Sequence, residues 1–209
     1  PQYEVGRLRR ALVAGAIVVA YLIAAHLGMS LIDANSVAIV VWPPAGVGVF
    51  ALLAAGRSMW PAVALASLVS GVWVGTPVLA ACAIALGNTL EALLGHALLS
   101  RSKESLGRET NPFAIGTVQH LADLTLASIL GPLVNVSIGV VVAHATGLVP
   151  RAELWLTARS WFISDALGIL VVLPGLASWP VLRRKRWRDA RLAEAIITSS
   201  VIGLACVMI

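Results

Sequence analysis

The chain alternates between long apolar runs and short polar segments. A helix needs about 20 mostly apolar residues to cross the ~30 Å hydrocarbon core of a bilayer. Most of the apolar runs approach this length, so each is predicted to be a transmembrane helix. The predicted helices cover residues 11–27, 36–55, 59–74, 78–99, 118–145, 154–176 and 192–209.

The second apolar run is interrupted by Trp42-Pro43-Pro44. Two successive prolines remove two backbone donors and clash with the preceding turn, so the helix must break or kink there. A helix over 43–55 spans only about 20 Å at 1.5 Å per residue, so residues 36–41 would have to complete the crossing. Broken helices line ligand sites in transporters. The alternative is a re-entrant turn anchored by an interfacial tryptophan.

The run at 118–145 contains Gly131-Pro132, which could separate two spans or kink a single one. The basic segments on either side decide between these alternatives, because Lys and Arg concentrate on the cytoplasmic side of membrane proteins. Both 101–108 and 183–188 are rich in Lys and Arg, so an even number of crossings must separate them. Since 154–176 is one crossing, 118–145 is predicted to be one as well.

The same charge rule orients the chain. With the amino terminus in the cytoplasm, all 15 Lys and Arg residues fall in cytoplasmic segments except Arg151 and Arg159. We therefore predict an all-α, polytopic transmembrane bundle of seven helices with a cytoplasmic amino terminus. Seven crossings would leave residue 209 outside, so we expect an eighth helix before any cytoplasmic domain.

Composition excludes several classes of protein. The chain is 59% hydrophobic and 12% charged, whereas soluble domains average about 45–50% apolar and about 25% charged. A chain of 209 residues has too little interior to hide this much apolar surface from water. It is therefore predicted to be an integral membrane protein. The net charge of +5 comes from clusters between apolar runs, which indicate membrane topology and not nucleic-acid binding.

Two carboxyl groups, those of Glu91 and Asp165, lie inside predicted spans. An ionisable side chain at the bilayer centre costs about 2.5–3.5 kcal/mol on insertion scales, so it usually faces the interior of a bundle. Asn88 shares a helix face with Glu91, and Trp161 shares one with Asp165, by their spacing of three and four residues. These residues could bind a ligand or a proton, or they could form a hydrogen-bond knot that only holds the helices together.

The sequence contains no recognisable motif for catalysis, a metal or a cofactor. The 4 histidines are not spaced as metal or haem ligands, and no cysteine or carboxylate completes a set. No phosphate-binding loop or nucleophile triad is present. We therefore predict no catalytic residue, no metal site and no cofactor within these residues.

Several motifs follow one another along the chain. They are Trp42-Pro43-Pro44-Ala45-Gly46, Gly56-Arg57 with Trp60-Pro61, Gly87-Asn88-Thr89-Leu90-Glu91-Ala92, and Trp161 with Asp165-Ala166-Leu167-Gly168 and Pro174. In this order and spacing the chain resembles the membrane-associated sensor 1 (MASE) domain family, over roughly residues 11–209. The resemblance implies a multi-pass sensory domain of the bacterial inner membrane, with one helix more than the seven predicted here.

The resemblance also marks the motif positions as candidates for a signal-binding site. These candidates are Trp42, Pro43, Pro44, Arg57, Trp60, Asn88, Glu91, Trp161 and Asp165. The chain departs from the family pattern at Phe162, where a second tryptophan is frequent, and this could alter a stacking surface.

The predicted function is signal input from residues 1–209 to a cytoplasmic output domain expected after residue 209. By the resemblance, this output is a histidine kinase or a cyclic di-GMP enzyme of the GGDEF or EAL type. The expected partners are the lipid bilayer and either a second copy, joined through the output domain, or other membrane subunits, with no nucleic acid. Two alternatives stay open: a non-catalytic subunit of a larger membrane complex, and a small transporter. The absence of an inverted repeat counts against the transporter.

Overall fold

The computed structural model describes residues 2–30, 41–105 and 118–184, which form helices and the turns between them. The α-helices are α1 (Gln2–Ser30), α2 (Pro43–Ala55), α3 (Trp60–Trp73), α4 (Val78–Ser105), α5 (Val118–Ala145), α6 (Leu154–Leu167) and α7 (Leu173–Arg184). Short 3-10 turns, η1 (Arg57–Met59) and η2 (Arg151–Glu153), precede α3 and α6. A π-helical segment, η3 (Gly168–Val172), joins α6 to α7. The all-helical prediction is confirmed for this part of the chain.

Four helical stretches are long and apolar enough to cross a membrane: Gly6–Ser30, Val78–Arg101, Val118–Ala145 and Arg151–Ser178. By contrast, α2 and α3 contain 13 and 14 residues. At 1.5 Å per residue they are about 20 Å long, which is too short for a ~30 Å core. The structure therefore does not support the predicted seven spanning helices. The predicted helix at 192–209 lies outside the described residues, and the helix count, the eighth helix and the cytoplasmic amino terminus stay predictions.

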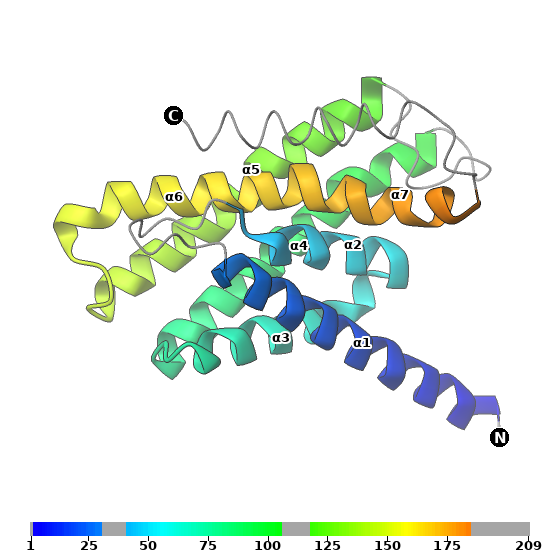
Figure 1. Ribbon diagram of the computed structural model, residues 1–209, viewed down its shortest axis with the longest axis horizontal. Coiled ribbons are helices and arrows are strands. Elements are labelled where there is room, and N and C mark those ends of the chain that lie inside the picture. Colours follow the sequence, from blue (N-terminus) through cyan, green and yellow to red (C-terminus); the bar gives the residue numbers. More distant parts are fainter. Residues whose placement is uncertain (1, 31–40, 106–117, 185–209) are drawn as a thin grey trace.

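The prediction of a single helix around Gly131-Pro132 is confirmed. Pro132 lies inside α5, which is unbroken from Val118 to Ala145. Membrane helices tolerate such a proline when neighbouring groups satisfy the freed carbonyl. The next predicted helix, at 154–176, is longer than expected. As Figure 1 shows, α6, η3 and α7 form one continuous rod, which reaches Arg184.

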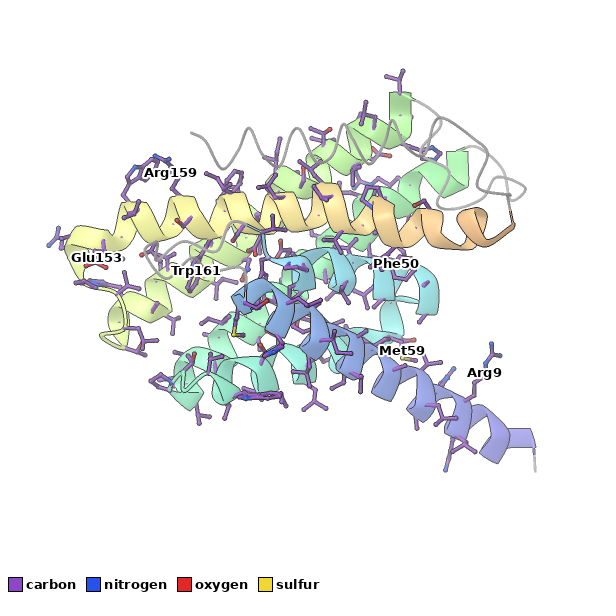
Figure 2. All side chains as sticks on the ribbon, viewed as in Figure 1. Arg9, Phe50, Met59, Glu153, Arg159 and Trp161 are labelled. Carbon is purple, nitrogen blue, oxygen red and sulfur yellow. The ribbon has the colours of Figure 1, made fainter. Side chains whose placement is uncertain are left out.

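From α1 to α6, successive helices run in alternating directions through the bundle, and α7 continues in the direction of α6 (Figure 1). The amino ends of α1 and α5, the turn η1 and the carboxyl ends of α4 and α7 lie toward one side of the molecule. Arg9 lies on this side, whereas Glu153 and Arg159 lie on the opposite side (Figure 2). Arg57 in η1 and Arg101 near the end of α4 therefore gather with Arg9, as the charge rule requires of one membrane face.

The core centres on α2, which is buried on nearly all sides. Residues 44–49 are all buried, and α1, α4, α6, η3 and α7 pack against this helix. A helix that is apolar all round is typical of a protein interior. Gly48 packs against Ala92 of α4 and Val63 of α3, while Gly46 packs against η3. Small residues such as these let membrane helices approach closely and gain packing contacts.

Gly168 provides a test of the packing between η3 and the start of α2. A β-carbon at Gly168 would overlap the carbonyl oxygen of Trp42, whereas one at Gly175 in α7 would meet nothing within 4 Å. We expect Gly168→Ala to lower the free energy of unfolding by about 1–3 kcal/mol, the usual cost of overpacking. Gly175→Ala should leave it unchanged or raise it by up to about 1 kcal/mol, because alanine favours a helix.

Unfolding by SDS in mixed micelles, followed by circular dichroism, measures both variants against the unmodified chain. Equal stability of Gly168→Ala and Gly175→Ala would contradict the close contact of η3 with Trp42.

Candidate functional site

The helix break predicted at Trp42-Pro43-Pro44 is confirmed as the start of α2. Pro43 and Pro44 occupy the first turn of α2, where the amides have no intrahelical partner to lose. The amide of Trp42 donates a hydrogen bond to the carbonyl of Ser164 in α6, with an N···O distance of 2.9 Å. The segment that would complete the crossing, 36–41, lies almost wholly outside the described residues.

The π segment η3 lies against this break. Gly168, its first residue, touches the carbonyl of Trp42 so closely that a β-carbon would not fit between them. Pro174 follows η3 as the second residue of α7. It cannot donate to the carbonyl of Leu170, and its ring crowds that carbonyl, which accounts for the widened turn just before it. Such π segments are rare and are frequently found at functional sites.

A chain of side-chain hydrogen bonds joins four helices beside the break. Asn135 of α5 donates from Nδ2 to Oδ1 of Asn88 in α4, at 2.8 Å, and to Oδ2 of Asp165 in α6, at 2.7 Å. Asn88 donates in turn to Oγ of Ser67 in α3, at 2.7 Å. All four side chains are buried. The amide of Asn135 therefore bridges α4 and α6, and Asn88 extends this series of hydrogen bonds to α3.

Glu91 lies one turn along α4 from Asn88 and is only 1% exposed. Among the described residues, neither of its carboxyl oxygens has a hydrogen-bond partner, and Oδ1 of Asn135 also has none. Its Cγ packs against Gly131 of α5, where a β-carbon would lie 3.1 Å away. Buried polar groups without partners are costly and rare in folded proteins. Stability alone does not explain a carboxyl group at this position.

A cavity of about 320 Å³ adjoins the hydrogen-bonded side chains of Ser67, Asn88, Asn135 and Asp165. Small-molecule sites usually measure about 300–1,000 Å³ and combine apolar walls with a few polar groups. Trp42 and Trp161 form aromatic parts of the wall, and Asp165 is the single ionisable side chain among the described wall residues. The polar side chains of the wall are those of Ser67, Ser70, Thr76, Asn88, Asn135, Ser164 and Asp165.

Each tryptophan of the cavity wall rests on a glycine of a neighbouring helix. A β-carbon at Gly139 of α5 would lie 2.6 Å from Cζ3 of Trp161. A β-carbon at Gly28 of α1 would lie 3.1 Å from Cε3 of Trp42. In Figure 2, Trp161 lies on the side of α6 that faces α5, while Arg159 points away from the bundle. The two aromatic side chains are therefore held in place by α1 and α5.

Most of the predicted site residues come together around this cavity. Pro43 and Pro44 begin α2 beside it, and Glu91 is buried one turn from a residue of its wall. Their role in signal binding stays a prediction. The residues that line the cavity directly are Trp42, Asn88, Trp161 and Asp165.

Arg57 and Trp60 do not join this group. They lie in η1 and at the start of α3, at the opposite end of α2 from Trp42. Arg57 is exposed, and Trp60 is 48% exposed. The 13 residues of α2 separate them from Trp42 by about 20 Å, and Trp60 lies about 10 Å along α3 from the wall residue Ser67. Neither Arg57 nor Trp60 belongs to the wall of the cavity.

Asn135 was not among the predicted site residues, although its amide makes two of the hydrogen bonds that join α4, α5 and α6. It is an amide within the otherwise apolar stretch 129–136, with Gly131 and Gly139 four residues away on either side. This spacing places all three on one helix face. A polar residue flanked by glycines on one face of a predicted span is the signal that could have identified it.

Two of the described histidines, His96 and His144, make contacts of an ordinary structural kind. His144 pairs through Nδ1 with the carbonyl of Val149 at 3.0 Å, and the Nε2 of His96 lies 3.5 Å from Oγ of Ser100. Within the described residues, no group of three His, Cys, Asp or Glu side chains is placed to hold a metal ion.

The fold and the cavity define a multi-pass helical membrane protein with a polar site inside its bundle. Residues 13–209 match the family MASE1, a family of membrane-associated sensor domains. The chain belongs to this family, and the resemblance carried by the sequence motifs is confirmed. No curated protein and no solved structure matches the chain.

The bridge through Asn135 can be tested by a double-mutant cycle of Asn135→Ala and Asp165→Ala. Hydrogen bonds between membrane helices contribute on average about 0.6 kcal/mol and at most about 1.7 kcal/mol in such cycles. We expect a coupling energy in this range, from unfolding by SDS in mixed micelles.

Ser137 of α5 provides the matched control, because it is exposed and its hydroxyl donates to Leu133 of its own helix. Ser137→Ala and Asp165→Ala should have additive effects. Additive effects of Asn135→Ala and Asp165→Ala would contradict the bridge.

Proposed function

We propose that this domain is a signal-input module. A stimulus that reaches the cavity would change the packing of the surrounding helices, and this change would pass across the membrane to a cytoplasmic output module. The main support is that the helix break and the hydrogen bonds between Ser67, Asn88, Asn135 and Asp165 meet at one cavity, with η3 packed against the break. Membership of a family of membrane sensor domains supports the sensory role.

The rod formed by α6, η3 and α7 provides a route for the signal. Asp165 belongs both to this rod and to the cavity wall, and the rod continues to Arg184 at the other side of the bundle (Figure 1). A ligand shifts an equilibrium between two packings only if it binds them with different affinity. A ligand that competes for the oxygens of Asp165 would do so, because it would weaken the bond from Asn135.

The membrane arrangement that fits this role has a cytoplasmic amino terminus in the inner membrane of a bacterium. It has seven helices up to residue 209 and an eighth that returns the chain to the cytoplasm. The output module would be a histidine kinase or a cyclic di-GMP enzyme of the GGDEF or EAL type. Two copies would pair through this module, or the domain would assemble with other membrane subunits. Arg9 lies at the same side of the bundle as η1, which contains Arg57, and as the carboxyl end of α4, which contains Arg101 (Figures 1 and 2), and this supports the orientation.

Cysteine labelling tests the orientation. In a variant with Cys82 and Cys206 replaced by serine, Ala152→Cys should react with a membrane-impermeant maleimide in intact cells. Ser58→Cys should react only after permeabilisation, because the positively charged end lies inside. Both positions are exposed. Labelling of Ser58→Cys alone in intact cells would reverse the proposed orientation.

The substitutions Asp165→Asn and Glu91→Gln test the signalling role in the protein that includes the output module. Both preserve side-chain size while they remove the acidic group. Allosteric coupling typically amounts to about 5–150-fold, so we expect output activity to change at least about fivefold. Autophosphorylation or cyclic di-GMP turnover in membrane vesicles measures this activity.

Glu153→Gln is the matched control, since Glu153 is an exposed carboxylate of η2 outside the cavity wall. It should leave the output unchanged. Unchanged output from both Asp165→Asn and Glu91→Gln, at normal protein abundance, would exclude these two carboxyl groups from signalling.

A further inference from the structure

The charge of the cavity wall restricts the kind of ligand that fits. Asp165 is 4% exposed and lines the cavity. Among the described wall residues there is no Lys, Arg or His, so nothing in this part of the wall neutralises its carboxylate. A buried charge is costly unless it is paired. When Asp165 is ionised, a cation is therefore the complementary guest, and an anion is repelled.

The two tryptophans favour an organic cation over a metal ion. Tryptophan is the best side-chain partner for a cation above an aromatic face, and Trp42 and Trp161 both contribute to the wall. A divalent metal would need several carboxylate or imidazole ligands. The described residues hold no group of three His, Cys, Asp or Glu side chains placed for a metal ion.

The hydroxyl groups of the wall indicate which organic cation fits best. Ser70 and Thr76 line the cavity together with Asp165, and their oxygens can accept hydrogen bonds. A primary ammonium group carries three N–H donors, which the carboxylate and hydroxyl groups of this wall can accept, whereas a quaternary ammonium carries none. The volume of about 320 Å³ lies near the lower limit of about 300 Å³ for ligand sites, so the ligand is small.

We propose that this cavity binds a small primary ammonium compound, with the ammonium group against Asp165 and the apolar part beside Trp42 and Trp161. The inference rests on the proposed function, because it names the class of ligand through which the cavity would receive its signal. Met29, Val74 and Thr76 also line the cavity. They lie at the end of α1 and around the α3–α4 turn, so the ligand would reach the cavity from the face opposite Arg57.

The first experiment compares compounds of equal size on the unmodified chain in nanodiscs. Propylammonium, propanol and propionate differ in charge at one end and little in shape, and tetramethylammonium carries charge without N–H donors. Titration calorimetry and ligand-dependent thermal stability measure binding. We expect propylammonium to bind at least about tenfold more tightly than the other three. Equal binding of propanol, preference for propionate, or equal binding of tetramethylammonium would overturn the proposal.

Substitutions then test the position of the ligand. Asp165→Asn should weaken propylammonium binding by about tenfold or more, and Trp161→Leu should weaken it by about fivefold. Glu153→Gln, which removes an exposed carboxylate elsewhere, should not change it. Unchanged affinity in both Asp165→Asn and Trp161→Leu would overturn the proposal. The comparison of compounds on the unmodified chain decides the question even if a variant does not fold.

Failure of this inference can be distinguished from failure of the proposed function. If no ammonium compound binds while Asp165→Asn still changes the output, the ligand assignment is wrong and the signalling role stands. If propylammonium binds as expected while the output is insensitive to Asp165→Asn and Glu91→Gln, the ligand assignment stands and the signalling role is wrong.

Discussion

The interior of a bilayer offers no water to an unpaired amide or carbonyl, so the backbone at the start of a helix must find its hydrogen-bond partners within the protein. Here the amide of Trp42 finds the carbonyl of Ser164. This bond draws α6 against the start of α2, and the two backbones can meet because Gly168 has no side chain at the contact. Gly46 then brings the next turn of α2 against η3. The central position of α2 depends on this meeting of two irregular backbone segments.

The hydrogen bonds of Asn135 determine where the helices lie more than they stabilise the fold. Such bonds contribute little to the folding of membrane helices, because the separated helices also find partners in the bilayer. Asn135 nevertheless specifies how α4 and α6 sit around α5, since Asn88 and Asp165 share its amide nitrogen. Glu91 is buried without a hydrogen-bond partner among the described residues. Its burial lowers the stability of the fold in the same region. A site arranged in this way can be repacked at a modest cost in free energy.

Much of the fold could be predicted from the sequence, but less of the site. The single helix over 118–145 follows from apolar length and the charges on either side, and the break at Trp42 follows from the chemistry of proline. The bridging role of Asn135 was not predictable in this way, because its partners come from helices far apart in the sequence. Arg57 and Trp60 were candidates through a family resemblance, which does not show which motifs meet in space.

The π segment has a geometric consequence for the rod from α6 to α7. Its buried residues Asp165, Ile169, Leu173 and Ala177 recur every four positions. In a regular α-helix such a row drifts by about 40° at each step, and the wider turn of η3 offsets part of this drift. The same face of the rod therefore stays on α2. Removing one residue within η3 would rotate α7 by about 100° about the axis of the rod. The length of η3 therefore determines which face of α7 lies on the same side as the cavity.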